Sequence, residues 1–162
     1  MRVFGMDPGV AKAGWAIVGD TVDDYGLFSP ASTREKFNDK LNEEIMSSVR
    51  FFRGKLREVD AVAWEIVPSF GALSQRDRVA GVATALKIVT WEMGLPWVGR
   101  VPMSIKKIAT GNAKASKSDM RAAALQRFPE LPNDKKLPAD VFDAIMIADV
   151  ARRKGEWSYE RL

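Results

Sequence analysis

Three short apolar runs, each followed by turn residues, open the chain. They cover residues 2–6, 14–18 and 25–28, and the dipeptides Pro-Gly, Gly-Asp and Ser-Pro come soon after them. Short apolar runs separated by turn residues are typical of strands joined by hairpins. The beginning of the chain therefore predicts a three-stranded antiparallel meander.

The next part of the chain alternates between helix and strand patterns. Apolar residues recur every three or four positions from residue 37 to residue 56, which predicts an amphipathic helix. Residues 59–66 are mostly apolar and predict a strand buried on both faces, with Glu65 near its end. Residues 75–93 return to helical spacing and predict a second helix.

The last part of the chain adds one strand and three helices. Residues 97–101 predict the strand, and residues 103–110 a short helix that begins at a proline. One further helix ends near residue 128, and the last runs from residue 138 to about residue 153. Hairpin strands followed by strand–helix units predict an α/β fold, with a mixed central sheet flanked by helices.

Length and composition are those of a globular chain. The 162 residues are 46% hydrophobic and 28% charged, so we predict one domain over residues 1–162. Its core covers about residues 2–153, and residues 154–162 form a short tail. The chain has no apolar run of about 18 residues, and its first residues lack the organisation of a signal peptide. We therefore expect a cytoplasmic protein without a membrane partner.

Cysteine and histidine are both absent from the sequence. Their absence excludes disulfides, Cys or His zinc ligands, a cysteine nucleophile and a Ser-His-Asp triad. Acid–base chemistry would have to use Asp, Glu, Lys, Tyr, a metal-bound water or a substrate group. The net charge of +4 is compatible with a nucleic-acid partner, and also with an ordinary basic protein that has none.

Four acidic residues lie at predicted strand ends and at a predicted helix start. Asp7 ends the first strand, Glu65 ends the buried strand, and Asp140 and Asp143 begin the last helix. Such carboxylates can hold two Mg²⁺ or Mn²⁺ ions, which activate water for attack on a phosphodiester. By position alone, a plain turn at Asp7 and a helix N-terminal pair at Asp140 and Asp143 stay open. Glu65 is more telling, because a carboxylate is costly to bury without a role.

Basic residues gather between residues 100 and 127, where seven positive charges face only one negative charge. They are Arg100, Lys106, Lys107, Lys114, Lys117, Arg121 and Arg127. Clustered Lys and Arg supply affinity for DNA phosphates, and a solvated charged face is the alternative interpretation. Arg76 and Arg78 are candidates to extend this surface.

Five groups of residues resemble, in order, motifs of the RuvC family of Holliday junction resolvases. They are GMDPG at 5–9 with GWAI at 14–17, AWE at 63–65, RVAG at 78–81, the basic segment 104–118, and ADVFDA at 139–144. The resemblance covers about residues 2–152. It implies a ribonuclease H-like fold and a homodimer that cuts symmetrically related strands of a four-way DNA junction with Mg²⁺ or Mn²⁺.

The resemblance also assigns roles to residues. It makes Asp7, Glu65, Asp140 and Asp143 the ligands of two metal ions. It places Lys106 and Lys117 at the junction backbone, and we expect Lys117 to stabilise the phosphate or assist a proton transfer. We expect further DNA contacts from the remaining basic candidates, which are Lys107, Lys114, Arg121 and Arg76. The helix that begins near residue 76 is the expected dimer interface, and the expected products are a 5′-phosphate and a 3′-hydroxyl.

The sequence departs from the family pattern between Glu65 and Gly81, where it is shorter than in bacterial members. Pro68 stands at the position of an aromatic residue that probes the junction centre, and Phe70 is the candidate for that role. The short loop favours a phage-type relative, and the expected setting is a bacterial cell or a phage-infected bacterial host. Two alternatives stay open: a nuclease for other branched DNA or RNA–DNA hybrids, and a non-catalytic junction-binding module.

Overall fold

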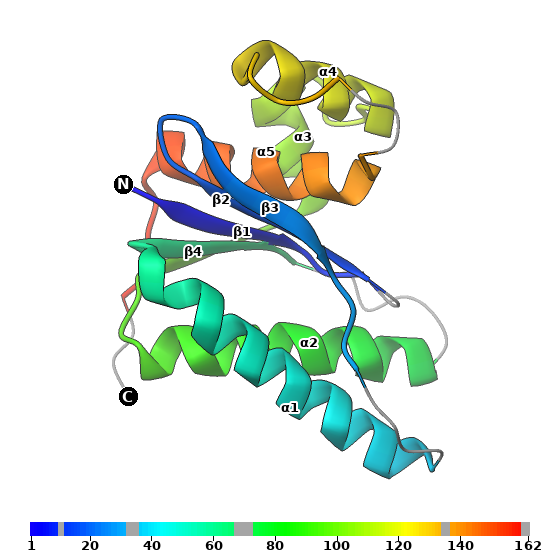
Figure 1. The fold of residues 1–162 in the computed structure, drawn as a ribbon. Coiled ribbons are helices and arrows are strands. Elements are labelled where there is room, and N and C mark those ends of the chain that lie inside the picture. The colour runs from blue at the N-terminus through cyan, green and yellow to red at the C-terminus, as the bar shows by residue number, and fades with distance from the viewer. Residues whose placement is uncertain (10–11, 32–35, 67–72, 134–136, 160–162) are drawn as a thin grey trace.

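A mixed β-sheet with helices on both faces forms the centre of the molecule (Figure 1). The structure is a computed structural model that describes residues 1–9, 12–31, 36–66, 73–133 and 137–159. Within these ranges five strands pair in the order β3-β2-β1-β4-β5. They are β1 (Val3–Asp7), β2 (Ala13–Val18), β3 (Val22–Phe28), β4 (Ala61–Glu65) and β5 (Trp97–Arg100).

The strand directions confirm the predicted meander and mixed sheet. Strands β1, β2 and β3 are antiparallel neighbours, whereas β4 runs parallel to β1, and β5 parallel to β4. The carboxyl ends of β1, β4 and β5 therefore meet at one edge of the sheet. Strand β3 begins three residues before the predicted run, at Val22. The sequence pattern did not indicate this start because Asp23 and Asp24 are exposed and charged. Charged residues are common on edge strands such as β3.

Two groups of helices cover the sheet, as Figure 1 shows. On one face lie α1 (Phe37–Lys55) and α2 (Leu73–Glu92), and the short 3₁₀-helix η1 (Leu56–Glu58) links α1 to β4. On the other face lies α5 (Ala139–Lys154), with α3 (Pro102–Thr110) and α4 (Lys117–Arg127) stacked against it. All of the helices expected from sequence are present. No helix in the described ranges has the length and apolar character that crossing a membrane requires.

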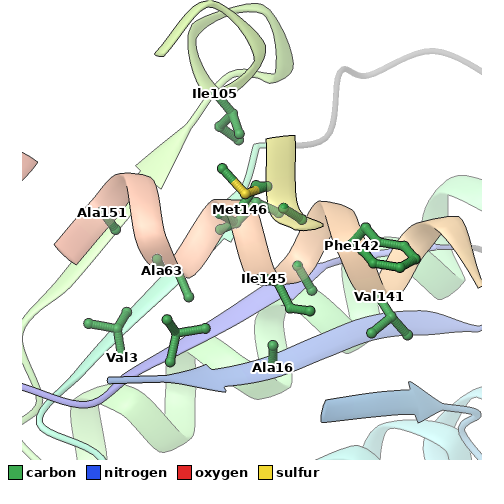
Figure 2. Close-up of a cluster of buried hydrophobic side chains, with 14 of the residues drawn as sticks. Val3, Ala16, Ala63, Ile105, Val141, Phe142, Ile145, Met146 and Ala151 are labelled. Carbon is green, nitrogen blue, oxygen red and sulfur yellow. The ribbon is translucent and has the colours of Figure 1, made fainter. Parts of the chain in front are cut away.

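Alternation along the strands divides the core into two clusters. Val3, Ala16 and Ala63 pack under α5, and Figure 2 shows Val141 and Ile145 of that helix among the side chains of this cluster. Residues of opposite parity, such as Phe4 and Trp64, pack with α1 and α2. Successive side chains of a strand point to opposite faces. Residues two positions apart in a strand therefore share a face. Glu65 lies on the α5 face with Ala63, and Asp7 lies on the same face with Val3, four positions before it.

Candidate active site

The first two acidic residues come from neighbouring parallel strands. Met6 pairs with Trp64 in the register of β1 and β4, so Asp7 and Glu65 follow at adjacent strand ends. Both lie on the face of the sheet that α5 covers. Parallel pairing thus brings together two carboxylates that are 58 positions apart in the chain.

Helix α5 supplies the other two carboxylates because two glycines let it touch the sheet backbone. A Cβ atom on Gly14 of β2 would lie 2.0 Å from the backbone oxygen of Asp140. One turn further along, a Cβ atom on Gly5 of β1 would lie 2.4 Å from the backbone oxygen of Ala144. Gly14 is also the β-partner of Asp7. Because Gly14 has no side chain, the first turn of α5 can pack directly against the backbone of β2, beside Asp7.

Three carboxylates meet at this point. Asp7, Asp140 and Asp143 each offer an oxygen atom, and these oxygens all lie within 4.8 Å of one another. Glu65 is not a member of this group, but it lines the same pocket as Asp7 and Asp143, which has a volume of about 230 Å³. All four acidic residues expected from the sequence thus lie at one end of the sheet.

The donor set fits a hard divalent cation. Carboxylate oxygens are the ligands that Mg²⁺ and Mn²⁺ favour, and clustered carboxylates repel each other when no cation lies between them. Burial raises the pKa of Asp7 to about 7, and the charges of Glu65, Asp143 and Asp140 add to this effect. Burial and the charge of Asp143 raise the pKa of Glu65 to about 7. Burial also raises the pKa of Asp143.

These pKa values predict how the metal-free protein responds to pH. Asp7 and Glu65 titrate near pH 7 in the folded chain, against 3.8 and 4.5 as free groups. The folded state therefore binds more protons than the unfolded state between these values, and its stability falls as the pH rises through this window. Replacing Asp7→Asn should raise the free energy of unfolding near pH 8 by on the order of 2 kcal/mol, and much less near pH 4. Urea unfolding with a chelator at both pH values measures this, and an equal effect at the two would contradict it.

Lys117 extends from the first turn of α4 into the carboxylate cluster. Its Nζ atom donates to Asp140 Oδ1 at 2.5 Å and lies 3.9 Å from Asp143 Oδ2. The hydrogen bond to Asp140 raises the pKa of Lys117. Ser116 caps α4: its side chain accepts from the backbone N–H of Asp119, whose carboxylate accepts from the backbone N–H of Ser116. This capping box fixes where α4, and with it Lys117, begins.

The other predicted DNA-contacting residues have different surroundings. Lys106 of α3 lines the carboxylate pocket. Lys107 and Lys114, which follow it in the chain, have exposed side chains. The guanidinium of Arg121 lies 4.7 Å from the centre of the Phe142 ring and donates to Asn133 at 3.3 Å, so it also holds α4 against α5. The backbone of Arg76 is in α2, but its side chain lies outside the described part of the structure, as does all of Phe70.

Some contributors to the site were missed by sequence analysis. Gly14 was noted only as part of a motif, although a glycine inside a strand often marks the close approach of another backbone. Asp149 is a second such residue, with no role expected from the sequence. It is fully buried in α5 and accepts hydrogen bonds from Arg127 of α4 at 3.2 Å and from Arg153 at 2.8 Å. A charged residue inside an otherwise apolar helix face could have indicated this link.

Comparisons with known proteins agree with this geometry. A family model described as "Crossover junction endodeoxyribonuclease RuvC" matches residues 3–150. The RuvC proteins of Helicobacter pylori strain G27 and Synechococcus sp. strain WH7803 are 30% identical over 152 residues and 29% identical over 160 residues. Each alignment covers 91% of this chain, with 94% of the first relative and 96% of the second.

Solved structures share the fold over almost the full length. Thermus thermophilus RuvC in complex with a Holliday junction substrate superposes with a TM-score of 0.82 at 20% identity, covering 99% of both chains. Another T. thermophilus RuvC structure has a TM-score of 0.77 at 19% identity, covering 99% of this chain and all of that one. The ribonuclease H-like fold expected from sequence is confirmed. By the match of the family model over residues 3–150, the chain belongs to the RuvC family of crossover junction endodeoxyribonucleases.

Proposed function

We propose that this protein is a metal-dependent endonuclease that resolves four-way (Holliday) junctions by paired hydrolysis of phosphodiester bonds. The observation that carries the proposal is the group of oxygen atoms from Asp7, Asp140 and Asp143, all within 4.8 Å of one another. The pocket beside it also contains two lysines, Lys106 and Lys117. Carboxylates for a cation beside ammonium groups for a phosphate suit a nuclease, and membership of the RuvC family supports the junction as substrate.

Asp7, Asp140 and Asp143, with Glu65 from the same pocket, are the residues that would hold Mg²⁺ or Mn²⁺, with two ions per site. When bound, such ions activate a water molecule and stabilise the leaving oxygen of the phosphodiester. The intact set of carboxylates argues against a non-catalytic junction-binding module, because a protein that only binds DNA gains nothing from acidic groups facing phosphates.

The chain's own residues orient the scissile phosphate. Lys117 and Lys106 donate hydrogen bonds to its oxygens, and Lys117 is the candidate to assist a proton transfer. Three apolar side chains of the pocket, Ile105, Met120 and Ile147, keep water from one side of the carboxylates. Hydrolysis leaves a 5′-phosphate and a 3′-hydroxyl.

Two equivalent strands must be cut in a four-way junction, so we propose a symmetric homodimer that presents two sites. Helix α2 is the candidate interface, because it covers the sheet face opposite to α5 (Figure 1). An interface there leaves both carboxylate pockets open to DNA. Sedimentation of the protein alone and on a junction tests the dimer, and a monomer in both states would refute it.

The lysines between residues 106 and 114, of which Lys106 lines the pocket, should set the affinity for junctions through their interaction with phosphates. Replacing Lys106→Ala, Lys107→Ala or Lys114→Ala should weaken binding to all junction sequences alike. The slope of log affinity against log salt concentration should become shallower by about 0.9 for each phosphate that a variant no longer neutralises. Binding titrations at several salt concentrations measure this, with Lys154→Ala at the exposed end of α5 as the charge-matched control. If the lysines only form a solvated face, all four variants will bind like the wild type.

Substrate choice is tested by direct competition. A labelled four-way junction is mixed with an unlabelled flap, an RNA–DNA hybrid or a linear duplex of the same sequence. Our proposal expects only an unlabelled junction to compete efficiently for cleavage. Strong competition by the hybrid or the flap would favour the alternative nuclease activities.

The setting of this activity is also a proposal. We propose that residues 1–162 form one nuclease domain that acts in the cytoplasm of a bacterium or of a phage-infected bacterial host. The phage-type origin stays a prediction that rests on the short segment between Glu65 and Gly81.

A further inference from the structure

The ammonium group of Lys117 lies against two of the three carboxylates that could hold a cation, Asp140 and Asp143. It donates to Asp140 at 2.5 Å and is 3.9 Å from Asp143. Both carboxylates belong to the group whose oxygen atoms lie within 4.8 Å of one another. A cation held by this group and the Lys117 ammonium therefore need the same two side chains.

The position of Lys117 is fixed by the packing of its helix. Along α4, Arg121 stacks on Phe142 and Arg127 pairs with the buried Asp149. The later residue of α4 thus contacts the later residue of α5, so the two helices run in the same general direction. This packing places the first turn of α4 beside the first turn of α5, where Asp140 lies. The contact between Lys117 and Asp140 is consequently part of how the two helices pack.

The side chain of Lys117 can nevertheless leave this position. It is 62% exposed, whereas the carboxylate of Asp143 is only 14% exposed. A DNA phosphate that approaches the pocket can accept hydrogen bonds from the same ammonium group. Ion pairs between partly exposed groups are weak. The hydrogen bond of Lys117 to a DNA phosphate can therefore replace its ion pair with Asp140.

We propose that Lys117 acts as an internal competitor of the metal ion: without DNA its ammonium occupies Asp140 and Asp143, and a DNA phosphate that takes the ammonium strengthens metal binding. This inference rests on the proposed metal site. Because coupling between two ligands is reciprocal, metal should strengthen junction binding by the same factor as the junction strengthens metal binding. Lys117 thereby becomes a positioning residue that links metal loading to the presence of substrate.

The test compares metal affinity in two lysine variants. Mn²⁺ is titrated into wild-type protein, Lys117→Met and Lys106→Met without DNA, and free Mn²⁺ is followed by its electron paramagnetic resonance signal. Both variants lose one positive charge from the same pocket, but only Lys117 makes an ion pair with the carboxylates. We expect Lys117→Met to bind Mn²⁺ about five-fold more tightly than Lys106→Met does, near the upper end of what a partly exposed ion pair contributes.

A second arm measures the coupling. Junction affinity is determined with and without Ca²⁺ for the wild type and Lys117→Met, and a denaturing gel verifies that the strands are intact. The factor by which Ca²⁺ strengthens junction binding should be smaller in Lys117→Met than in the wild type. Equal Mn²⁺ affinities in Lys117→Met and Lys106→Met, or an unchanged coupling factor, would overturn the competition while leaving the metal site intact. Failure of wild-type protein to bind Mn²⁺ more tightly than Asp7→Asn would overturn the metal site as well.

Discussion

Replacing Asp7→Asn should abolish cleavage of a four-way junction while leaving junction binding in place. Asp7 is the member of the carboxylate group that comes from the centre of the sheet, and its oxygen lies within 4.8 Å of those of Asp140 and Asp143. Loss of a ligand from the proposed metal site should remove several kcal/mol of transition-state stabilisation, so the cleavage rate should fall by about 10³-fold or more. Binding should hold or improve, because the change removes a negative charge that repels phosphates.

The matched control is Asp39→Asn, which removes an exposed carboxylate from α1 on the opposite face of the sheet. Single-turnover cleavage and gel-shift binding are measured for both variants and for Glu65→Gln. Full cleavage by Asp7→Asn and Glu65→Gln would disprove the metal-site assignment. Equal loss of binding and cleavage in Asp7→Asn would point to misfolding.

Replacing Gly14→Ala should disrupt both stability and cleavage. The added Cβ would lie 2.0 Å from the backbone oxygen of Asp140, a distance that real structures do not tolerate. Helix α5 would have to move away from β2 and carry Asp140 and Asp143 away from Asp7. Overpacking of this kind costs about 1–3 kcal/mol or somewhat more, and we expect the upper part of that range because the clash is with backbone. Urea unfolding and junction cleavage measure the two effects.

Gly54→Ala is the control for Gly14→Ala. Gly54 lies inside α1, and a Cβ atom there would meet nothing within 4 Å. Alanine in a helix is more stable than glycine by about 0.5–1 kcal/mol, so this variant should gain stability and retain cleavage. Wild-type stability and cleavage in Gly14→Ala would show that α5 is not seated on the backbone of β2.

The order of strands and helices could be predicted from the sequence because burial leaves a regular pattern. Residues 59–66 are mostly apolar, with Ala61 to Trp64 apolar in succession, and a strand covered by helices on both faces produces that pattern. Apolar residues recur every three or four positions between residues 37 and 56 because one face of α1 packs on the core. The start of β3 was missed, since an exposed edge strand places no constraint on Asp23 and Asp24.

The carboxylates of the site could be named from sequence, but their arrangement could not. Asp7 and Glu65 follow buried strands, and the end of a strand is a position that a sequence pattern reveals. How closely α5 approaches the sheet depends on Gly14 meeting Asp140, a contact between backbones 126 positions apart. The ion pair between Lys117 and Asp140 depends in the same way on how α4 packs against α5. Hydrophobic periodicity carries no information about either contact.

The most direct test of the central claim is cleavage of a four-way junction by the purified protein. Each strand is labelled in turn, and the reaction is run with Mg²⁺, with Mn²⁺ and with a chelator, beside a linear duplex of the same sequence. Our account predicts metal-dependent nicks at symmetrically related positions of two strands, with 5′-phosphate ends that a ligase can seal, and no cutting of the duplex. Absence of metal-dependent cleavage, or equal cutting of junction and duplex, would contradict it.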